Sequence, residues 1–213
     1  MVQLELAAAR PPAWQRPAGA YTTGGCFVCF ARGAGGRGVA DEPAWAAASL
    51  AVGARIVCSA VMEGLAGDAY EPGLLALREG PLLEAAIRAL PRMPDVLLVN
   101  ATGRDHPRRA GLAVQLGAVL EIPSIGVTHR PLLARGRWPP DEPGARTALL
   151  IDGEEVGCWL RTRPRARPLA VHPGWRTNLD TACAVVLAAV GRARAPEALR
   201  EARRLARCAR AGV

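Results

Sequence analysis

The chain has 213 residues, half of them hydrophobic, which is enough to bury a substantial core within one domain. Its formal net charge is +8 and all 27 basic residues are arginines, so anionic partners are favoured over cationic ones. The sequence shows neither a signal peptide nor an apolar run that could span a bilayer, so we expect a cytoplasmic protein without membrane contacts.

The first part of the chain predicts a short helix followed by an antiparallel β-meander. The elements are, in chain order, a helix over 4–10, a strand over 18–30, a glycine-rich loop over 32–43, and strands over 45–52 and 55–63. Cys26 and Cys29 form a CxxC inside the first strand, where alternation sends the two sulfurs to opposite faces. Because no second cysteine pair completes a zinc set, we expect the cysteines to be buried, reduced thiols.

The second part alternates helices with short strands. The predicted elements are a helical segment over 74–79, a new helix from Gly80-Pro81 to Leu90, strands over 96–99 and 122–127 around a helix over 110–120, hairpin strands over 149–151 and 155–162, a strand over 169–172, and helices over 178–190 and 196–210. The order indicates an α/β fold of the ribonuclease H-like type, a mixed central sheet of an antiparallel meander plus parallel strands, flanked by helices. We expect one domain over 1–213, with a core over 17–192 and an Arg-rich C-terminal helix within 193–213.

The loop after the strand at 96–99 is the centre of the predicted site. The four aliphatic residues of this strand have the pattern of a strand buried on both faces, and Asn100 follows at its carboxyl end. A basic cluster, His106-Pro107-Arg108-Arg109, precedes the helix at 110–120. A polar loop and a basic helix start after a strand predict an anion site.

Several motifs give the chain a more specific resemblance. They are Tyr70-Glu71-Pro72-Gly73-Leu74, Arg78-Glu79, the block DHPRRAG at 105–111, IPSIGV at 122–127, and Gly174 with Asp180-Thr181-Ala182. On these motifs the chain resembles the endonuclease V family over residues 18–190. The resemblance implies a nuclease that cuts DNA or RNA near a deaminated purine, with Mg²⁺ held by acidic residues that activate water and neutralise the phosphate.

The resemblance also implies that most metal-ligand positions are substituted. Tyr21 follows Gly19-Ala20 where the family has its first-strand aspartate, Asn100 replaces the aspartate of the central strand, and only the helical glutamate is kept, as Glu79. We therefore expect no bound metal, or Glu79 and Asn100 as its only ligands. A shifted register, with Asp41 or Asp105 supplying the missing acid, is the alternative.

Further substitutions change the charge of the expected pocket. His129 stands where the family has lysine, Trp175 where it has histidine, and Glu71 where the loop that wedges open the nucleic acid is apolar, while Tyr70 is kept. The expected surroundings are positive, with His106, His129 and, as anion ligands, Arg108, Arg109 and Arg176, beside Tyr70 and Trp175. Each has a structural alternative: His106 positions the loop, Arg108 and Arg109 form a solvated face, and His172 is a packed core residue.

Three functions fit these residues. The favoured hypothesis is a metal-independent, cofactor-free enzyme in which Glu79 or a histidine takes a proton from a small anionic substrate that expels phosphate or sulfate by intramolecular displacement or elimination, in a biosynthetic role. The catalytic set would be Glu79, His106, His129, Asn100 and Tyr21, and a partner protein that completes the site is left open. The alternatives are an impaired endonuclease V homologue that binds DNA or RNA, and an active Mg²⁺-dependent endonuclease.

Overall fold

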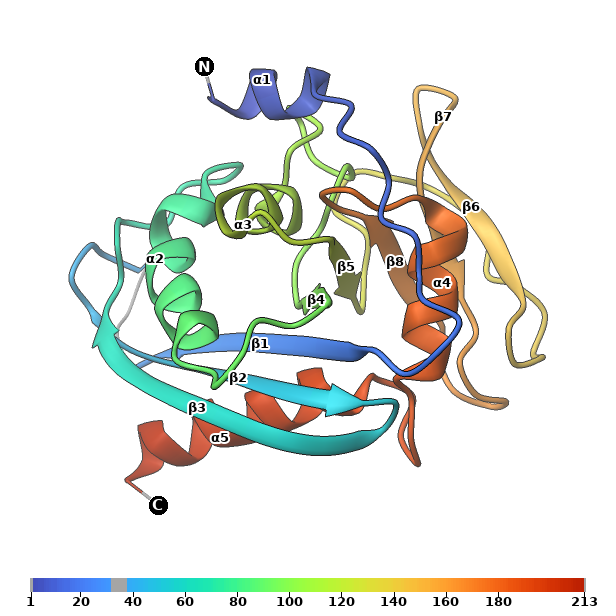
Figure 1. Cartoon of the computed structure of the whole chain (residues 1–213). Helices are drawn as coiled ribbons and strands as arrows, with labels where there is room; N and C mark the ends of the chain where they lie inside the picture. The colour runs from blue at the N-terminus through green and yellow to red at the C-terminus, as the bar shows by residue number, and fades with distance from the viewer. Residues whose placement is uncertain (1, 32–37, 213) are drawn as a thin grey trace.

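A mixed eight-stranded sheet forms the centre of the computed structural model, which describes residues 2–31 and 38–212. Its strands are β1 Thr22–Phe30, β2 Pro43–Val52, β3 Arg55–Leu65, β4 Val96–Val99, β5 Ser124–Thr128, β6 Arg146–Ile151, β7 Glu154–Leu160 and β8 Leu169–Pro173. They lie in the order β3-β2-β1-β4-β5-β8-β7-β6 (Figure 1). β1, β2 and β3 form the predicted antiparallel meander, and β4 and β5 join it as parallel strands. This confirms the predicted fold class.

The helices cover both faces of the sheet. They are α1 Val2–Ala8, α2 Leu75–Arg88, α3 Leu112–Leu120, α4 Leu179–Ala188 and α5 Glu197–Ala211. β4 shows why both faces must be covered: Leu97 and Val99 lie in the core beneath α2 and α3, and Val96 and Leu98 lie in the core beneath α4. Figure 1 shows α2 above the meander and α5 below it.

The amino end of α5 lies directly against β1. Ser49 of β2 donates to the carbonyl of Ala198 at 2.6 Å. A Cβ at Gly25 would lie 2.5 Å or less from Ala198 and Leu199 backbone atoms, so only glycine admits this approach. The division into a core over 17–192 and a terminal segment over 193–213 stays a prediction. In the structure, α5 packs against β1 and β2 of the central sheet.

The structure differs from the prediction around Pro81, which lies inside α2 and does not begin a new helix. Proline cannot donate to the carbonyl of Leu77 one turn earlier. The amide of Gly67 instead donates to the neighbouring carbonyl of Arg78 at 2.9 Å, and a Cβ at Gly67 would lie 2.4 Å from the Leu77 carbonyl oxygen. The loop between β3 and α2 therefore supports the helical turn that Pro81 weakens.

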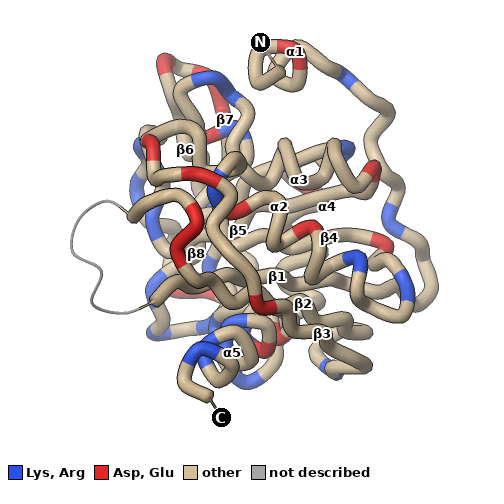
Figure 2. The backbone as a smooth tube through the Cα atoms, turned by 90° about the vertical axis from the view of Figure 1, so that its left-hand side faces the viewer, with Lys and Arg blue, Asp and Glu red and all other residues tan. Residues whose placement is uncertain are grey.

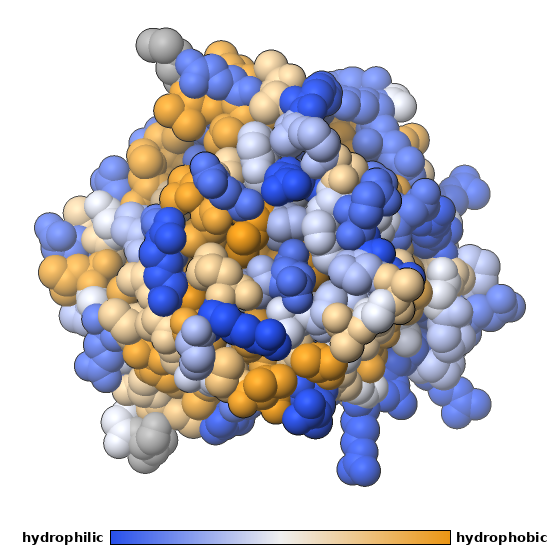
Figure 3. Space-filling view, viewed as in Figure 1, coloured by the Kyte–Doolittle hydropathy of each residue, from blue (hydrophilic) through white to orange (hydrophobic). Residues whose placement is uncertain are grey.

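Other differences are small. The first helix ends at Ala8, the first strand begins at Thr22, and the expected hairpin turns at Asp152-Gly153 with positive φ angles of 52° and 82°. Residues 32–37 of the predicted glycine-rich loop lie outside the described residues. No helix in the described ranges is long and apolar enough to cross a membrane. On the face shown in Figure 3, hydrophobic side chains gather on the side of α2 and hydrophilic ones on the side of β6 and β7.

Candidate functional site

The carboxyl end of β4 and the middle of β1 bring together a thiol, an amide and a carboxyl group. The two strands are parallel and Cys26 pairs in register with Val99, so Asn100 follows beside it. Glu79 of α2 lies on the same face and is close enough for its charge to raise the pKa of Cys26. The residue beside Asn100 is therefore Cys26, which the sequence analysis did not place in the site.

The thiol and the amide are uncharged near neutral pH, and the carboxyl group is only partly ionised. Burial raises the pKa of Glu79 to about 7, an effect only partly offset by Arg78. Burial also raises the pKa of the Cys26 thiol, with a further contribution from Glu79. Mg²⁺ is a hard cation that takes oxygen ligands, usually carboxylates. A neutral thiol, an amide and one half-protonated carboxyl group do not fit it, and no group of three His, Cys, Asp or Glu suited to a metal occurs in the described chain.

The two acids considered as replacements are held elsewhere. Asp105 is fully buried, and its carboxylate accepts from the backbone amides of Leu132, Leu133 and Ala134 at 2.6, 2.8 and 2.9 Å. It thereby fixes the loop after β5. Asp41 is an exposed turn residue with a φ of 57°. Neither carboxylate joins Glu79 and Asn100.

A cavity of about 370 Å³ adjoins the end of β4. Its lining is mostly apolar and includes Tyr70, Pro72 and Leu75 on one side and Ala101, Leu112 and Leu133 on the other. Thr102, His106 and Gln115 add polar groups. Tyr70 is 43% exposed, so its ring is accessible from solvent. The cavity therefore has an apolar body, an aromatic residue in its wall and a few polar atoms, which is the usual composition of a ligand pocket.

His106 holds the wall of this cavity in place. Its Nδ1 accepts from the amide of Arg108 at 3.2 Å, which leaves Nε2 to donate to the carbonyl of Gly73, also at 3.2 Å. Gln3 of α1 donates to the same carbonyl at 2.9 Å and accepts from Arg108 at 2.7 Å. Burial lowers the pKa of His106, which favours the neutral ring that these contacts require. The geometry therefore supports a positioning role, and a catalytic role stays a prediction.

Arg109 does not face the cavity. Its φ of 55° is left-handed, and its guanidinium lies 3.2 Å from the carboxylate of Glu154 and 4.0 Å from that of Asp152, at the β6–β7 turn. The structure thus engages Arg108 with α1 and Arg109 with the hairpin, and does not bring the two together as an anion clamp.

Tyr21, Trp175 and Arg176 lie at the opposite edge of the sheet. Tyr21 precedes β1, next to Thr22, whose amide and hydroxyl donate to Asp95 before β4. The amide of Trp175 donates to the hydroxyl of Ser124 at 2.8 Å, at the amino end of β5. The structure therefore does not bring Tyr21 and Trp175 together with Asn100, because they lie near the amino ends of β1 and β5 and Asn100 follows the carboxyl end of β4.

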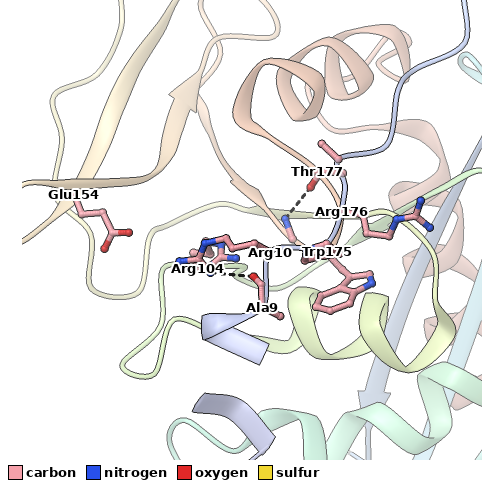
Figure 4. Close-up of a pocket in the computed structure, with 10 residues that line it drawn as sticks. Ala9, Arg10, Arg104, Glu154, Trp175, Arg176 and Thr177 are labelled. Carbon is pink, nitrogen blue, oxygen red and sulfur yellow. Dashed lines mark hydrogen bonds between the residues drawn. The ribbon is translucent and has the colours of Figure 1, made fainter. Parts of the chain in front are cut away.

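This edge has its own cavity of about 310 Å³, lined by Arg10, Arg104, Trp175 and Arg176. Figure 4 shows Arg10 and Arg104 side by side, with Glu154 further away. Arg104 donates to the carbonyl of Ala7 at 3.1 Å, as does Arg10 at 2.7 Å, so both guanidinium groups are engaged at the end of α1.

His129 lies in a third region, a basic groove of about 800 Å³ along α5. We define the basic groove by His129, Arg194, Arg203 and Arg207. Glu197 and Glu201 also line it, each paired with an arginine of α5. The Nδ1 atom of His129 accepts a hydrogen bond from Arg194 at 3.1 Å. Burial, together with the charges of Arg194 and Arg203, lowers the pKa of His129. Burial, and secondarily Arg207, lowers the pKa of Arg203, whose buried Nε has no hydrogen-bond partner among the described residues.

The basic groove attracts anions, because its cations lie close enough to repel one another. Figure 2 shows basic residues (blue) along and around α5. Sequence analysis expected a helix here, but it could not show that Arg203 and Arg207 turn toward Phe27 of β1, with guanidinium carbons 5.4 and 5.9 Å from its ring centroid.

The sequence of this chain is similar to those of known proteins of one family. The Endonuclease V family model matches residues 38–204, a range that begins after β1. Endonuclease V of Methanopyrus kandleri is 45% identical over 147 residues, which cover 69% of this chain and 63% of that protein. Endonuclease V of Streptomyces coelicolor is 40% identical over 154 residues, covering 72% and 66%. The matched part spans about three fifths of the length of the first of these relatives.

Solved structures extend the likeness to the whole fold. The Endonuclease V structure from Streptomyces avermitilis has a TM-score of 0.86 at 34% identity and covers 98% of this chain and 88% of that one. Ciona intestinalis Endonuclease V, solved in complex with a 23mer DNA containing an inosine, has a TM-score of 0.83, and at 18% identity it shows the fold alone. The family model and the similar relatives support the nuclease-family alternatives better than a small-molecule enzyme. The chain belongs to the endonuclease V family.

Proposed function

We propose that this protein binds nucleic acid, takes one extruded base into the cavity beside β4, and has lost most metal-dependent cleavage. The cavity wall of residues 70–73, positioned by His106 and Gln3, is the observation that carries the proposal. A base can enter such a pocket only after it leaves the stack, and aromatic and apolar side chains then replace its stacking partners.

The composition of the cavity suits a purine ring. Tyr70 offers an exposed ring face, and Leu75 and Leu112 line the apolar interior. Gln115 has its amide nitrogen 2.9 Å from the carbonyl of Ala110, so its carbonyl oxygen is left to accept from a ligand. The name of the Ciona relative's complex, with an inosine-containing DNA, makes a deaminated purine the first base to test.

The basic groove would hold the backbone of the bound strand. Phosphate contacts by arginine supply most sequence-independent affinity and make it fall with salt. Arg203 and Arg207 are suited to this because no carboxylate is ion-paired with either of them in the described part of the chain. The base cavity then supplies selectivity and the groove supplies affinity.

The uncharged site at Cys26, Glu79 and Asn100 favours binding without efficient cutting. The family resemblance implies carboxylates that hold Mg²⁺, and the groups present do not fit that ion. The alternative of a small anionic substrate would need Tyr21, His129 and Arg176 in one pocket, but His129 lies in the basic groove, apart from Tyr21 and Arg176. The geometry therefore favours nucleic-acid binding.

A direct test measures fluorescence anisotropy with single-stranded oligonucleotides that differ only in adenine or hypoxanthine at one position, in EDTA. We expect tighter binding of the hypoxanthine strand, loss of this preference in Tyr70→Ala, and no loss in Trp138→Ala, an exposed tryptophan outside the cavity. Absence of binding to either strand would refute the proposal. Rapid cleavage with Mg²⁺ that disappears in Glu79→Gln would establish the active nuclease instead.

A further inference from the structure

Two cysteines far from the cavity and the basic groove lie in direct contact. Cys158 on β7 and Cys183 on α4 have their sulfur atoms 3.3 Å apart, and both side chains are buried, with 1% and 5% exposure. They belong to the core between α4 and the sheet. The sequence indicates buried, reduced thiols and gives no reason to pair these two cysteines, which are 25 residues apart.

The pair is electrostatically asymmetric. Cys158 and Cys183 share a hydrogen bond in which either thiol can donate, and this contact, together with the nearby Arg146 guanidinium, lowers the pKa of Cys183. The same hydrogen bond and burial raise the pKa of Cys158. Arg146 is held in place by Asp180 of the first turn of α4, at 2.6 Å. Of the two thiols, Cys183 is therefore the more readily deprotonated, and its neighbour lies close enough to react with an oxidised sulfur.

A surface cavity reaches Cys158, whose sulfur contacts that of Cys183. Its volume is about 390 Å³, and Arg146, Glu155, Cys158 and Asp180 contribute to its lining. A small, uncharged oxidant can enter a space of this size, whereas the other faces of the two sulfurs are covered by the core. The remaining buried cysteines are engaged differently: Cys26 points its sulfur at the Leu98 carbonyl at 3.9 Å, and Cys29 at that of Ala206 at 3.3 Å.

We propose that Cys158 and Cys183 form a redox-active dithiol site that a hydroperoxide oxidises to an intramolecular disulfide bond. The Cys183 thiolate attacks one peroxide oxygen, the O–O bond breaks, and a sulfenic acid forms as hydroxide leaves. The Cys158 sulfur then attacks the sulfenic acid sulfur and expels its oxygen as water. Two thiols and one hydrogen peroxide thus give one disulfide and two waters, with the sulfurs oxidised and the peroxide oxygens reduced.

The bond would fasten α4 to β7. The loop that it closes contains β8, together with the turn at residues 174–177 through which Ser124 of β5 is held. Cross-linking a loop of this length reduces the freedom of the unfolded chain, so the oxidised protein should melt at a temperature higher by roughly 5 to 10 °C.

The test treats the full-length protein with dilute hydrogen peroxide, alkylates the remaining thiols under denaturing conditions, and measures intact mass and disulfide-linked peptides. We expect four alkylated cysteines out of six, one linkage between the peptides of Cys158 and Cys183, and reversal by dithiothreitol. The linkage should be absent in Cys158→Ser and in Cys183→Ala. It should persist in Cys58→Ser, a partly exposed cysteine on β3 that serves as the matched control.

Six alkylated thiols after oxidation, a linkage between other cysteines, or oxidation of Cys183 to a sulfinic acid without a bond would each overturn the proposal. Because the wild-type protein alone decides among these results, misfolding of a variant cannot hide the answer. The rise in melting temperature must also be confined to proteins that keep both cysteines. None of these readouts depends on nucleic-acid binding.

Discussion

Glu79 should make the protein less stable as pH rises through neutrality. Its pKa is raised from 4.5 to about 7 in the folded protein, mainly by burial. The unfolded chain therefore releases this proton at lower pH than the folded one, and the stability present below about pH 4.5 is lost as pH rises through about 7. At about 1.4 kcal/mol per pKa unit, the loss is on the order of 3 kcal/mol.

Glu79→Gln removes this dependence because the amide is neutral at every pH. In urea unfolding, the free energy of unfolding of the variant relative to that of the wild type should rise by about 2 to 3 kcal/mol between about pH 5 and pH 8. Glu84→Gln, on the same helix but paired with Arg88 at the surface, is the control and should show no such gain. A difference between Glu79→Gln and wild type that stays constant over this range would refute the assignment of Glu79 as a buried, largely protonated acid.

Three further changes test other parts of the structure. Asp105→Ala should lower the free energy of unfolding by about 2 to 3 kcal/mol, seen in urea titration, because three amides at residues 132–134 lose their charged acceptor. Arg203→Gln should weaken oligonucleotide binding and reduce the slope of log affinity against log salt by about 1, and an unchanged slope would remove Arg203 from the phosphate path. The double variant Cys26→Asp/Asn100→Asp should bind Mn²⁺ by calorimetry where the wild type does not, and continued absence of binding would show that more than ligand charge has been lost.

The fold could be predicted because its strongest signals are local. The uninterrupted aliphatic run of β4 required burial on both faces, and the turn at Asp152-Gly153 fixed the β6–β7 hairpin. The single helix through Pro81 could not be predicted, since the hydrogen bond from Gly67 to Arg78 that supports it comes from a different segment. Local rules correctly describe the weakness of a proline in a helix, and only the tertiary structure shows how it is compensated.

The site was harder to predict because it depends on strand register. The motifs predict Glu79 and Asn100 as site residues, because Glu79 belongs to a helical motif and Asn100 follows the end of a buried strand. They did not identify Cys26, because only the pairing of Cys26 with Val99 shows which residue of β1 lies beside Asn100. Tyr21, which the resemblance places in the site, lies before the amino end of β1, and Cys26 of the same strand lies beside the end of β4. The role of Arg203 could not be predicted for a similar reason, since the direction of its side chain depends on how α5 packs across β1.

The placement of Cys26 changes what the substitutions mean for nucleic-acid binding. Two aspartates at the positions of Cys26 and Asn100 would repel a phosphate unless a cation lay between them. Cys26 and Asn100 carry no charge, and Glu79 is only partly ionised near neutral pH, so this repulsion is mostly removed. The basic groove meanwhile keeps its attraction for phosphate. Binding of nucleic acid should therefore need no divalent cation, and affinity measured in EDTA should equal affinity measured in Mg²⁺ at matched ionic strength.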